Sequence, residues 1–155
     1  MKHDYKKLAI YLAIPLAVGG LAALLSGGMD TYKQLNQPPL SPPGWIFPIV
    51  WSILYLLMGY ASYRIAISQA PREERRKALW FYGIQLFLNF LWPIIFFGLE
   101  LYWLAFFVLL ALWVFIYLAM HLFGAIDDTA ENLLIPYLLW VTFAGYLNLG
   151  VALLN

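Results

Sequence analysis

Five long runs of uncharged, mostly apolar residues constrain this chain more than any other feature. A helix needs about 20 apolar residues to cross the hydrocarbon core of a bilayer. Runs of about that length, free of Asp, Glu, Lys and Arg, are Leu8–Ser26, Trp45–Tyr63, Ala78–Leu99, Leu101–Phe123 and Asn132–Asn155. The sequence therefore predicts an all-α fold, an integral membrane bundle of five transmembrane helices in one domain, 1–155. Its helices are expected at about 8–26, 45–67, 78–99, 101–123 and 132–154.

Composition supports the membrane assignment and excludes several function classes. The chain is 64% hydrophobic and 11% charged, against about 25% charged residues in soluble domains. It has no cysteine and only two histidines, His3 and His121, which lie far apart. A disulfide framework, a metal site and a Ser–His–Asp hydrolase are therefore not expected. Because the runs carry no charge, neither a proton relay nor a voltage sensor is expected.

The first run follows the segment MKHDYKK and could be taken for a secretory signal. Its apolar core is longer than that of a typical signal and contains Pro15. We therefore expect it to be a helix of the mature protein.

The basic residues predict the orientation. If the helices alternate in direction, only Lys33 falls on one side, and the other side receives Lys2, Lys6, Lys7, Arg64, Arg72, Arg75, Arg76 and Lys77. Basic residues concentrate in cytoplasmic segments, so the N-terminus is expected in the cytoplasm and the C-terminus outside. The run SQAPREERRK is interpreted as a cytoplasmic link that sets orientation, not as a nucleic-acid site.

The stretch PPLSPPGWIFPIVW, from Pro38 to Trp51, joins the first two predicted helices. Proline fixes φ and removes the backbone donor, so PPLSPP must be a stiff connection outside a helix. It closes a long outer loop, 27–44, and loops of this length are usually functional or disordered. Two interpretations stay open: a lid with Tyr32 over a pocket, or a turn that only starts a helix.

The seven tryptophans fall into two groups. Trp45, Trp80 and Trp103 start predicted helices, where aromatic residues anchor the membrane interface, and Trp113 lies mid-helix without a polar companion. The others share helix faces with polar or small residues, in the sets Gln85–Asn89–Trp92, Trp140–Ala144–Asn148 and Trp51–Tyr55–Met58.

Amides within a membrane are costly unless paired, so these faces should point into the bundle. One interpretation is interhelical packing alone. The other is a pocket in the outer half, since most of these residues lie about 10–15 Å below the outer helix ends. Small residues nearby, Gly19, Gly20, Ala144 and Gly145, would leave room in it. Indole walls with few amides suit a large, flat, mostly apolar molecule.

Three motifs, PPLSPPGWIFPIVWSILYLLMGYASY, QLFLNFLW and LLIPYLLWVTFAGYLN, resemble the translocator protein family in order and spacing. Its bacterial members are called tryptophan-rich sensory proteins (TspO), and its mitochondrial members peripheral-type benzodiazepine receptors. The resemblance covers the chain from about Asp30 to Asn155. It implies a five-helix bundle, a homodimer, and one pocket under the first loop that binds tetrapyrroles such as protoporphyrin IX or benzodiazepine-type ligands, with no cofactor required.

Carried over by motif, the resemblance implies ligand-binding residues at Tyr32, Trp45, Trp51, Tyr55, Asn89, Trp92, Trp140, Phe143, Ala144 and Asn148. Relatives often have an aromatic residue where this chain has Leu40, and often a tryptophan at Thr31. The animal cholesterol motif needs a basic residue near the C-terminus, and none follows Lys77. Cholesterol is therefore not the expected ligand.

The expected function is a receptor or sensor in the bacterial inner membrane. Its partners are the lipid bilayer and a flat apolar ligand, with no nucleic acid and no metal. One alternative is light-dependent degradation of bound porphyrin, with Trp51 and Trp140 as the oxidisable residues. A second alternative is transport of porphyrin or another hydrophobic molecule. Neither an internal repeat nor a polar inner lining supports transport.

Overall fold

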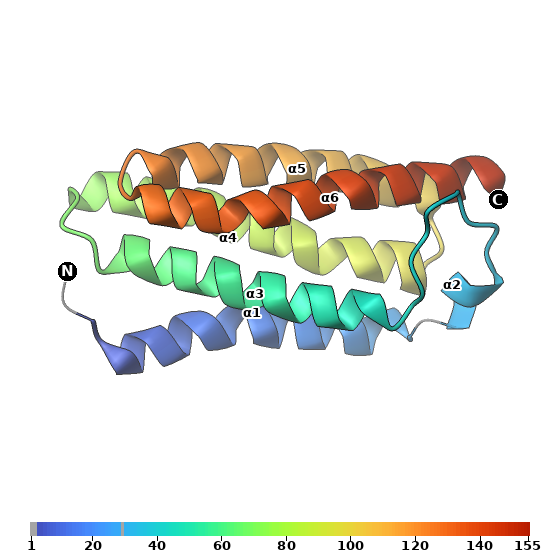
Figure 1. The fold of residues 1–155 in the computed structure, drawn as a ribbon, viewed down its shortest axis with the longest axis horizontal. Coiled ribbons are helices and arrows are strands. Elements are labelled where there is room, and N and C mark those ends of the chain that lie inside the picture. Colours follow the sequence, from blue (N-terminus) through green and yellow to red (C-terminus); the bar gives the residue numbers. More distant parts are fainter. Residues whose placement is uncertain (1–2, 29) are drawn as a thin grey trace.

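Five long antiparallel helices form the molecule (Figure 1), a computed structural model that describes residues 3–28 and 30–155. They are α1 (Tyr5–Ser26), α3 (Ile46–Ala66), α4 (Arg72–Pro93), α5 (Tyr102–Gly124) and α6 (Asp128–Leu154). The described residues form no strand. A short helix, α2 (Asp30–Gln34), lies in the first loop, and a π-helix, η1 (Ile94–Gly98), continues α4. Five helices are long and apolar enough to span a membrane, which confirms the predicted fold class.

Charged turns extend several helices beyond the uncharged runs. Helix α4 begins at Arg72, directly after Pro71, and α6 begins at Asp128, whereas the uncharged runs begin at Ala78 and Asn132. At the start of α1, the Asp4 carboxylate accepts hydrogen bonds from the backbone N–H groups of Lys6 and Lys7, at 3.1 and 3.2 Å. These caps satisfy backbone donors that have no intrahelical partner. The helix starts therefore lie at the capping residues Asp4 and Asp127 and at Pro71, not at the first residue of each apolar run.

Pro93 accounts for the change of helix type at the end of α4. Proline has no backbone N–H and cannot bond to the carbonyl one turn earlier, so the helical ladder is interrupted there. The chain continues as the π-turn of η1, where the Leu99 N–H donates to the Ile94 carbonyl at 2.9 Å. Glu100 then takes a positive φ of 57° in the tight connection to α5.

The N-terminus, the α3–α4 link and the α5–α6 link lie at one end of the bundle (Figure 1). We call this the inner end, after the predicted orientation, because the described basic residues other than Lys33 lie in the helix turns next to these segments. Lys2, part of the same predicted set, lies outside the described residues. The opposite, outer end carries α2, the first loop and the C-terminus.

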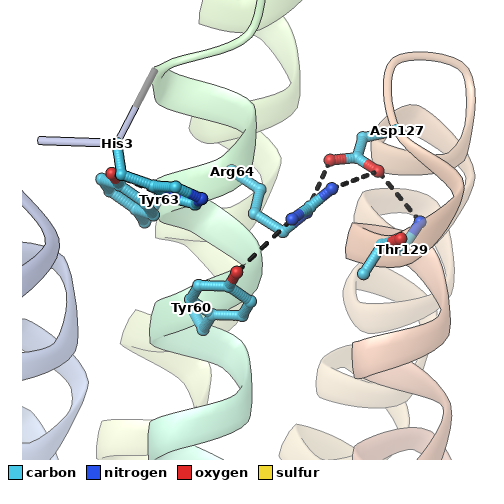
Figure 2. A network of polar contacts seen from close by, with 6 residues as sticks. All are labelled: His3, Tyr60, Tyr63, Arg64, Asp127 and Thr129. Carbon is cyan, nitrogen blue, oxygen red and sulfur yellow. Dashed lines mark hydrogen bonds and ion pairs between the residues drawn. The ribbon is translucent and has the colours of Figure 1, made fainter. Parts of the chain in front are cut away.

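A polar network joins the helices at the inner end (Figure 2). The Arg64 guanidinium on α3 pairs with the Asp127 carboxylate before α6, with Nε to Oδ2 at 2.7 Å, and also donates to the Tyr60 hydroxyl at 3.4 Å. Asp127 caps α6 through the Thr129 N–H at 2.9 Å. The Tyr63 hydroxyl accepts from the Asp4 backbone N–H at 2.7 Å. These contacts tie α1, α3 and α6 together.

Candidate ligand-binding site

A cavity of about 340 Å³ lies between α1, α3 and α4 in the outer half of the bundle. Most of its lining is apolar, with aromatic side chains from α3, α4 and η1 and small residues from α1. The described residues that line it are Leu16, Gly19, Gly20, Ala22, Ala23, Ser26, Gly28, Phe47, Pro48, Trp51, Ser52, Tyr55, Asn89, Trp92, Pro93 and Phe97.

Glycines set the spacing between α1 and α3. At Gly59 the helices touch, since a Cβ there would meet the Tyr11 carbonyl oxygen at 2.7 Å and the Leu12 Cα at 3.0 Å. Farther out, a Cβ on Gly19 would meet the Tyr55 ring, whereas one on Gly20 would meet nothing within 4 Å. The two helices therefore pack closely in the inner half and leave space in the outer half. The exposed residues Gly20, Ala23 and Ser52 lie along the rim, so the cavity opens between α1 and α3 toward the lipid.

Aromatic rings separate this cavity from a second, smaller one. The second cavity, of about 20 Å³, lies beneath Tyr32 and next to α6, and both cavities are lined by Phe47, Trp51, Trp92 and Phe97. Phe47 meets Trp140 edge to face with centroids 5.9 Å apart, and the same ring meets Tyr32 at 5.3 Å. Edge-to-face contacts of this kind favour a fixed arrangement of rings. The rings form a preformed aromatic wall.

A chain of buried hydrogen bonds runs from the larger cavity into the core. The Tyr55 hydroxyl donates to Asn89 Oδ1 at 2.9 Å, Asn89 Nδ2 donates to the Tyr137 hydroxyl at 2.6 Å, and Tyr137 donates to Gln85 Oε1 at 2.7 Å. Four polar side chains from α3, α4 and α6 thus satisfy one another, as buried polar groups require. Both interpretations of these amides therefore apply: they join the helices, and a cavity lies beside them.

Asn148 is held in a separate contact. Its Oδ1 accepts the Trp92 indole N–H at 2.9 Å, and its Nδ2 donates to the Tyr102 carbonyl at 2.9 Å. This amide fixes the Trp92 ring and joins α4 and α6 to the start of α5. Asn148 positions a wall of the cavity and does not line it.

The first loop, where the structure describes it, is fastened to α6. The Tyr146 hydroxyl donates to the Pro39 carbonyl at 2.6 Å, and Asn155 Nδ2 donates to the Asn36 carbonyl at 2.8 Å. Pro38 lies so close to Gly150 that a Cβ at that position would collide with it. Tyr32 is only 4% exposed, and burial raises the pKa of its phenol. The loop therefore covers the smaller cavity with a neutral aromatic ring.

The sequence-predicted site residues divide between the two cavities. The larger is lined by Trp51, Tyr55, Asn89 and Trp92, and the smaller by Tyr32, Trp51, Trp92, Trp140 and Ala144. Neither lining includes Asn148, Phe143 or Trp45. Phe143 packs against Trp140 with ring centroids 5.6 Å apart, and the Trp45 side chain is 67% exposed.

Sequence reasoning missed most of the α1 wall and the ring of Phe97. Gly19 and Gly20 were expected to leave room, but Leu16, Ala23 and Ser26 gave no signal in an apolar helix without periodicity. Phe97 lies in η1, and its position follows from the interruption at Pro93. Trp113, expected to lack a polar companion, instead donates to Thr142 Oγ1 at 2.9 Å.

Comparison with known proteins decides the family. The model of the TspO/MBR family matches residues 11–154. The chain belongs to the TspO/MBR family. It is similar to a tryptophan-rich protein TspO of Chlorobaculum tepidum, with 35% identity over all of this chain and 99% of the relative.

Two further relatives show a similar degree of identity. A tryptophan-rich sensory protein of Cereibacter sphaeroides is 37% identical over all of this chain and 95% of its own length. The translocator protein of Bos taurus is 38% identical, covering 78% of this chain and 72% of its own. The resemblance seen in the sequence motifs is thus confirmed. Within residues 3–28 and 30–155, no three His, Cys, Asp or Glu side chains could together hold a metal ion.

Proposed function

We propose that this protein is a membrane receptor or sensor that binds flat, mostly apolar molecules, tetrapyrroles such as protoporphyrin IX among them. The observation that carries the proposal is the cavity walled by Trp51 and Trp92, with the polar groups of Tyr55 and Asn89 at one end. Its volume of about 340 Å³ lies in the range of small-molecule sites. Because it opens between α1 and α3, a macrocycle larger than the cavity could extend through the rim, with its propionates near the outer surface.

The names of the relatives support this proposal. One relative is named a sensory protein and others translocator proteins. Benzodiazepine-type ligands would meet the same aromatic wall. By the distribution of basic residues, we place the inner end in the cytoplasm of a bacterial cell and the chain in its inner membrane. We also propose a homodimer, as the family resemblance implies.

A titration with protoporphyrin IX tests the proposal. The detergent-purified protein is titrated in the dark while absorbance and tryptophan fluorescence are followed. We expect saturable quenching, weakened about tenfold or more in Trp51→Ala, because loss of the indole removes a cavity wall and its stacking surface. Trp80→Ala, which truncates an exposed tryptophan away from the cavity, is the control. Saturable binding that is equal in all three proteins would show that this cavity is not the site.

Light-dependent porphyrin degradation is the second candidate. The surroundings of Trp51 favour this function. The centroid of its ring lies 5.7 Å from that of Tyr55 and 6.2 Å from that of Tyr137, so several oxidisable rings lie beside the cavity. Illumination of the saturated complex separates the two functions. A stable spectrum supports a receptor, and bleaching that needs the protein and is lost in Trp51→Phe with Trp140→Phe supports an enzyme. Transport ranks third, because a closed polar network lies at the inner end.

A further inference from the structure

The hydroxyl groups on the cavity wall share one property: each donates its proton in a hydrogen bond to another protein atom. Ser26 Oγ donates to the Ala22 carbonyl at 2.5 Å, and Ser52 Oγ donates to the Pro48 carbonyl at 2.7 Å. The Tyr55 hydroxyl donates to Asn89 Oδ1 at 2.9 Å. A hydroxyl has one proton and two lone pairs. As long as these bonds are kept, the three oxygens can only accept a hydrogen bond from a ligand.

The direction of donation along the buried chain of hydrogen bonds makes the Tyr55 oxygen an acceptor. At the far end of the chain, Gln85 Nε2 faces the Met58 sulfur at 4.0 Å. A thioether sulfur has no proton and is an acceptor only. The structure accordingly has the Gln85 NH₂ toward Met58 and its oxygen toward Tyr137.

Every other bond of the chain follows from that orientation. Tyr137 has to donate to Gln85, so its oxygen accepts from the Asn89 NH₂. The Asn89 oxygen then accepts the proton of Tyr55. With all donors aligned in one direction, the bonds polarise one another. The unused lone pair at the cavity end of the chain belongs to Tyr55.

Tyr55 also lies at the inner end of the cavity. Along α3, which runs inward, it is the last lining residue, and along α4, which runs outward, Asn89 is the first. We propose that this end of the cavity selects ligands that present an N–H or O–H donor, with the Tyr55 phenol oxygen as the acceptor. This specificity rests on the proposed function, that flat apolar molecules occupy the cavity.

Two donors near the same wall define the competing preference. Trp51, one turn farther out on α3, has an indole N–H donor. The Asn89 NH₂ has a second hydrogen that is not used in the bond to Tyr137. If either governed recognition, the cavity would prefer ligands with an acceptor. Selectivity between a donor and an acceptor of the same shape therefore tests the assignment.

Carbazole, dibenzofuran and 9-fluorenone make this comparison possible. All three are flat tricyclic molecules, carrying an N–H donor, a weak ether acceptor and a carbonyl acceptor respectively. Each is titrated calorimetrically into the purified protein in dodecylmaltoside, with protein-free micelles as the blank. We expect wild type to bind carbazole about tenfold more tightly than dibenzofuran, the size of effect that one additional hydrogen bond gives. In Tyr55→Phe this ratio should fall to about one.

Gln85→Leu tests the direction of the chain. Without the glutamine, the Tyr137 proton has no acceptor unless Asn89 turns its amide around. Asn89 would then donate to Tyr55 and release the Tyr55 proton into the cavity. We expect the preference to reverse in this variant, with 9-fluorenone bound more tightly than carbazole. Thr142→Val is the matched control, because it removes a hydrogen bond between α5 and α6 away from both cavities.

The outcomes are separable. If none of the three ligands binds with saturation, the proposed function fails at this cavity. If all three bind equally to wild type, the proposed function stands and the donor selectivity is wrong. Tighter binding of 9-fluorenone to wild type would also overturn the assignment, and would indicate recognition by Trp51 or Asn89. Should Gln85→Leu not fold, the Tyr55→Phe ratios alone still decide between these results.

Discussion

Around Trp51 the helices leave a cavity, whereas about three turns farther in, around Tyr63, they close completely. Tyr63 and Ile65 on α3, Ala78 on α4 and Phe123 on α5 have no exposed surface. In the outer half, Trp51, Phe47 and Phe97 remain partly exposed along a cavity of about 340 Å³. Both halves are built from aromatic and small apolar residues.

The contrast indicates where a ligand can enter. Gly59 brings α1 onto α3 in the inner half, and the Arg64–Asp127 pair fastens α3 to the start of α6. A molecule in the outer cavity has open space toward the lipid between α1 and α3 and a closely packed core beneath it. This arrangement suits reversible binding from the membrane better than passage across it.

Truncating one ring in each half should give the largest difference in stability. Tyr63→Ala removes a ring with no exposed surface and a hydrogen bond to the Asp4 N–H, and should cost about 3–5 kcal/mol. Trp51→Ala removes a larger ring that already borders empty space, and should cost about 1–2 kcal/mol. Unfolding by SDS in mixed micelles, followed by circular dichroism, measures both. Equal losses would contradict the difference in packing.

Breaking the inner ion pair should have the next largest effect. The Arg64 and Asp127 side chains are 20% and 10% exposed, between the surface and buried cases, so Arg64→Leu should cost about 2 kcal/mol. Asp127→Ser removes the charge and keeps a capping oxygen for the Thr129 N–H. The double variant should then cost less than the sum of the two single variants. Additive losses in the same SDS unfolding measurement would mean that the pair does not hold the inner end.

Releasing the first loop should affect the outer half only. Tyr146→Phe removes the hydrogen bond to the Pro39 carbonyl and should cost about 1 kcal/mol. Backbone amides of the loop 31–44 should exchange hydrogen faster in this variant, while those around Tyr63 should not change. Thr142→Val, one turn earlier on α6, is the control. Faster exchange at both ends would show that the halves are coupled.

The smallest effect concerns Leu40. It is 83% exposed and has a φ of 70°, a left-handed conformation that glycine adopts without strain. Leu40→Gly should therefore leave stability unchanged or raise it by up to about 1 kcal/mol. Thermal unfolding monitored by tryptophan fluorescence checks this. A clear loss would mean that the Leu40 side chain makes contacts that the exposed surface does not reveal.

Much of the fold could be predicted from hydropathy, because a membrane allows few alternatives to apolar helices. Five uncharged runs correspond to five helices, and the amide spacings on α4 and α6 do turn Gln85, Asn89 and Asn148 into the core. The helix ends at Arg72 and Asp128 could not be predicted from those runs, since charged turns extend the helices beyond them.

The site could be predicted only in part. Trp51, Trp92 and Asn89 were recognisable because a polar or aromatic residue repeats at helical spacing. The α1 wall gave no such pattern, because the helix is apolar on every side and its contribution depends on where glycine lets α3 approach. The direction of hydrogen-bond donation, from Tyr55 through Asn89 and Tyr137 to Gln85, depends on contacts among three helices, which the sequence alone does not contain.

The most direct test of the open outer cavity is to fill it and measure binding. At both Gly20 and Gly83 an added Cβ would meet nothing within 4 Å, but only Gly20 lines the cavity. Protoporphyrin IX is titrated into wild type, Gly20→Leu and Gly83→Leu, following tryptophan quenching. The expected result is at least a tenfold loss of affinity in Gly20→Leu with wild-type affinity in Gly83→Leu. Unchanged affinity in Gly20→Leu would contradict the account and place the ligand elsewhere on the protein.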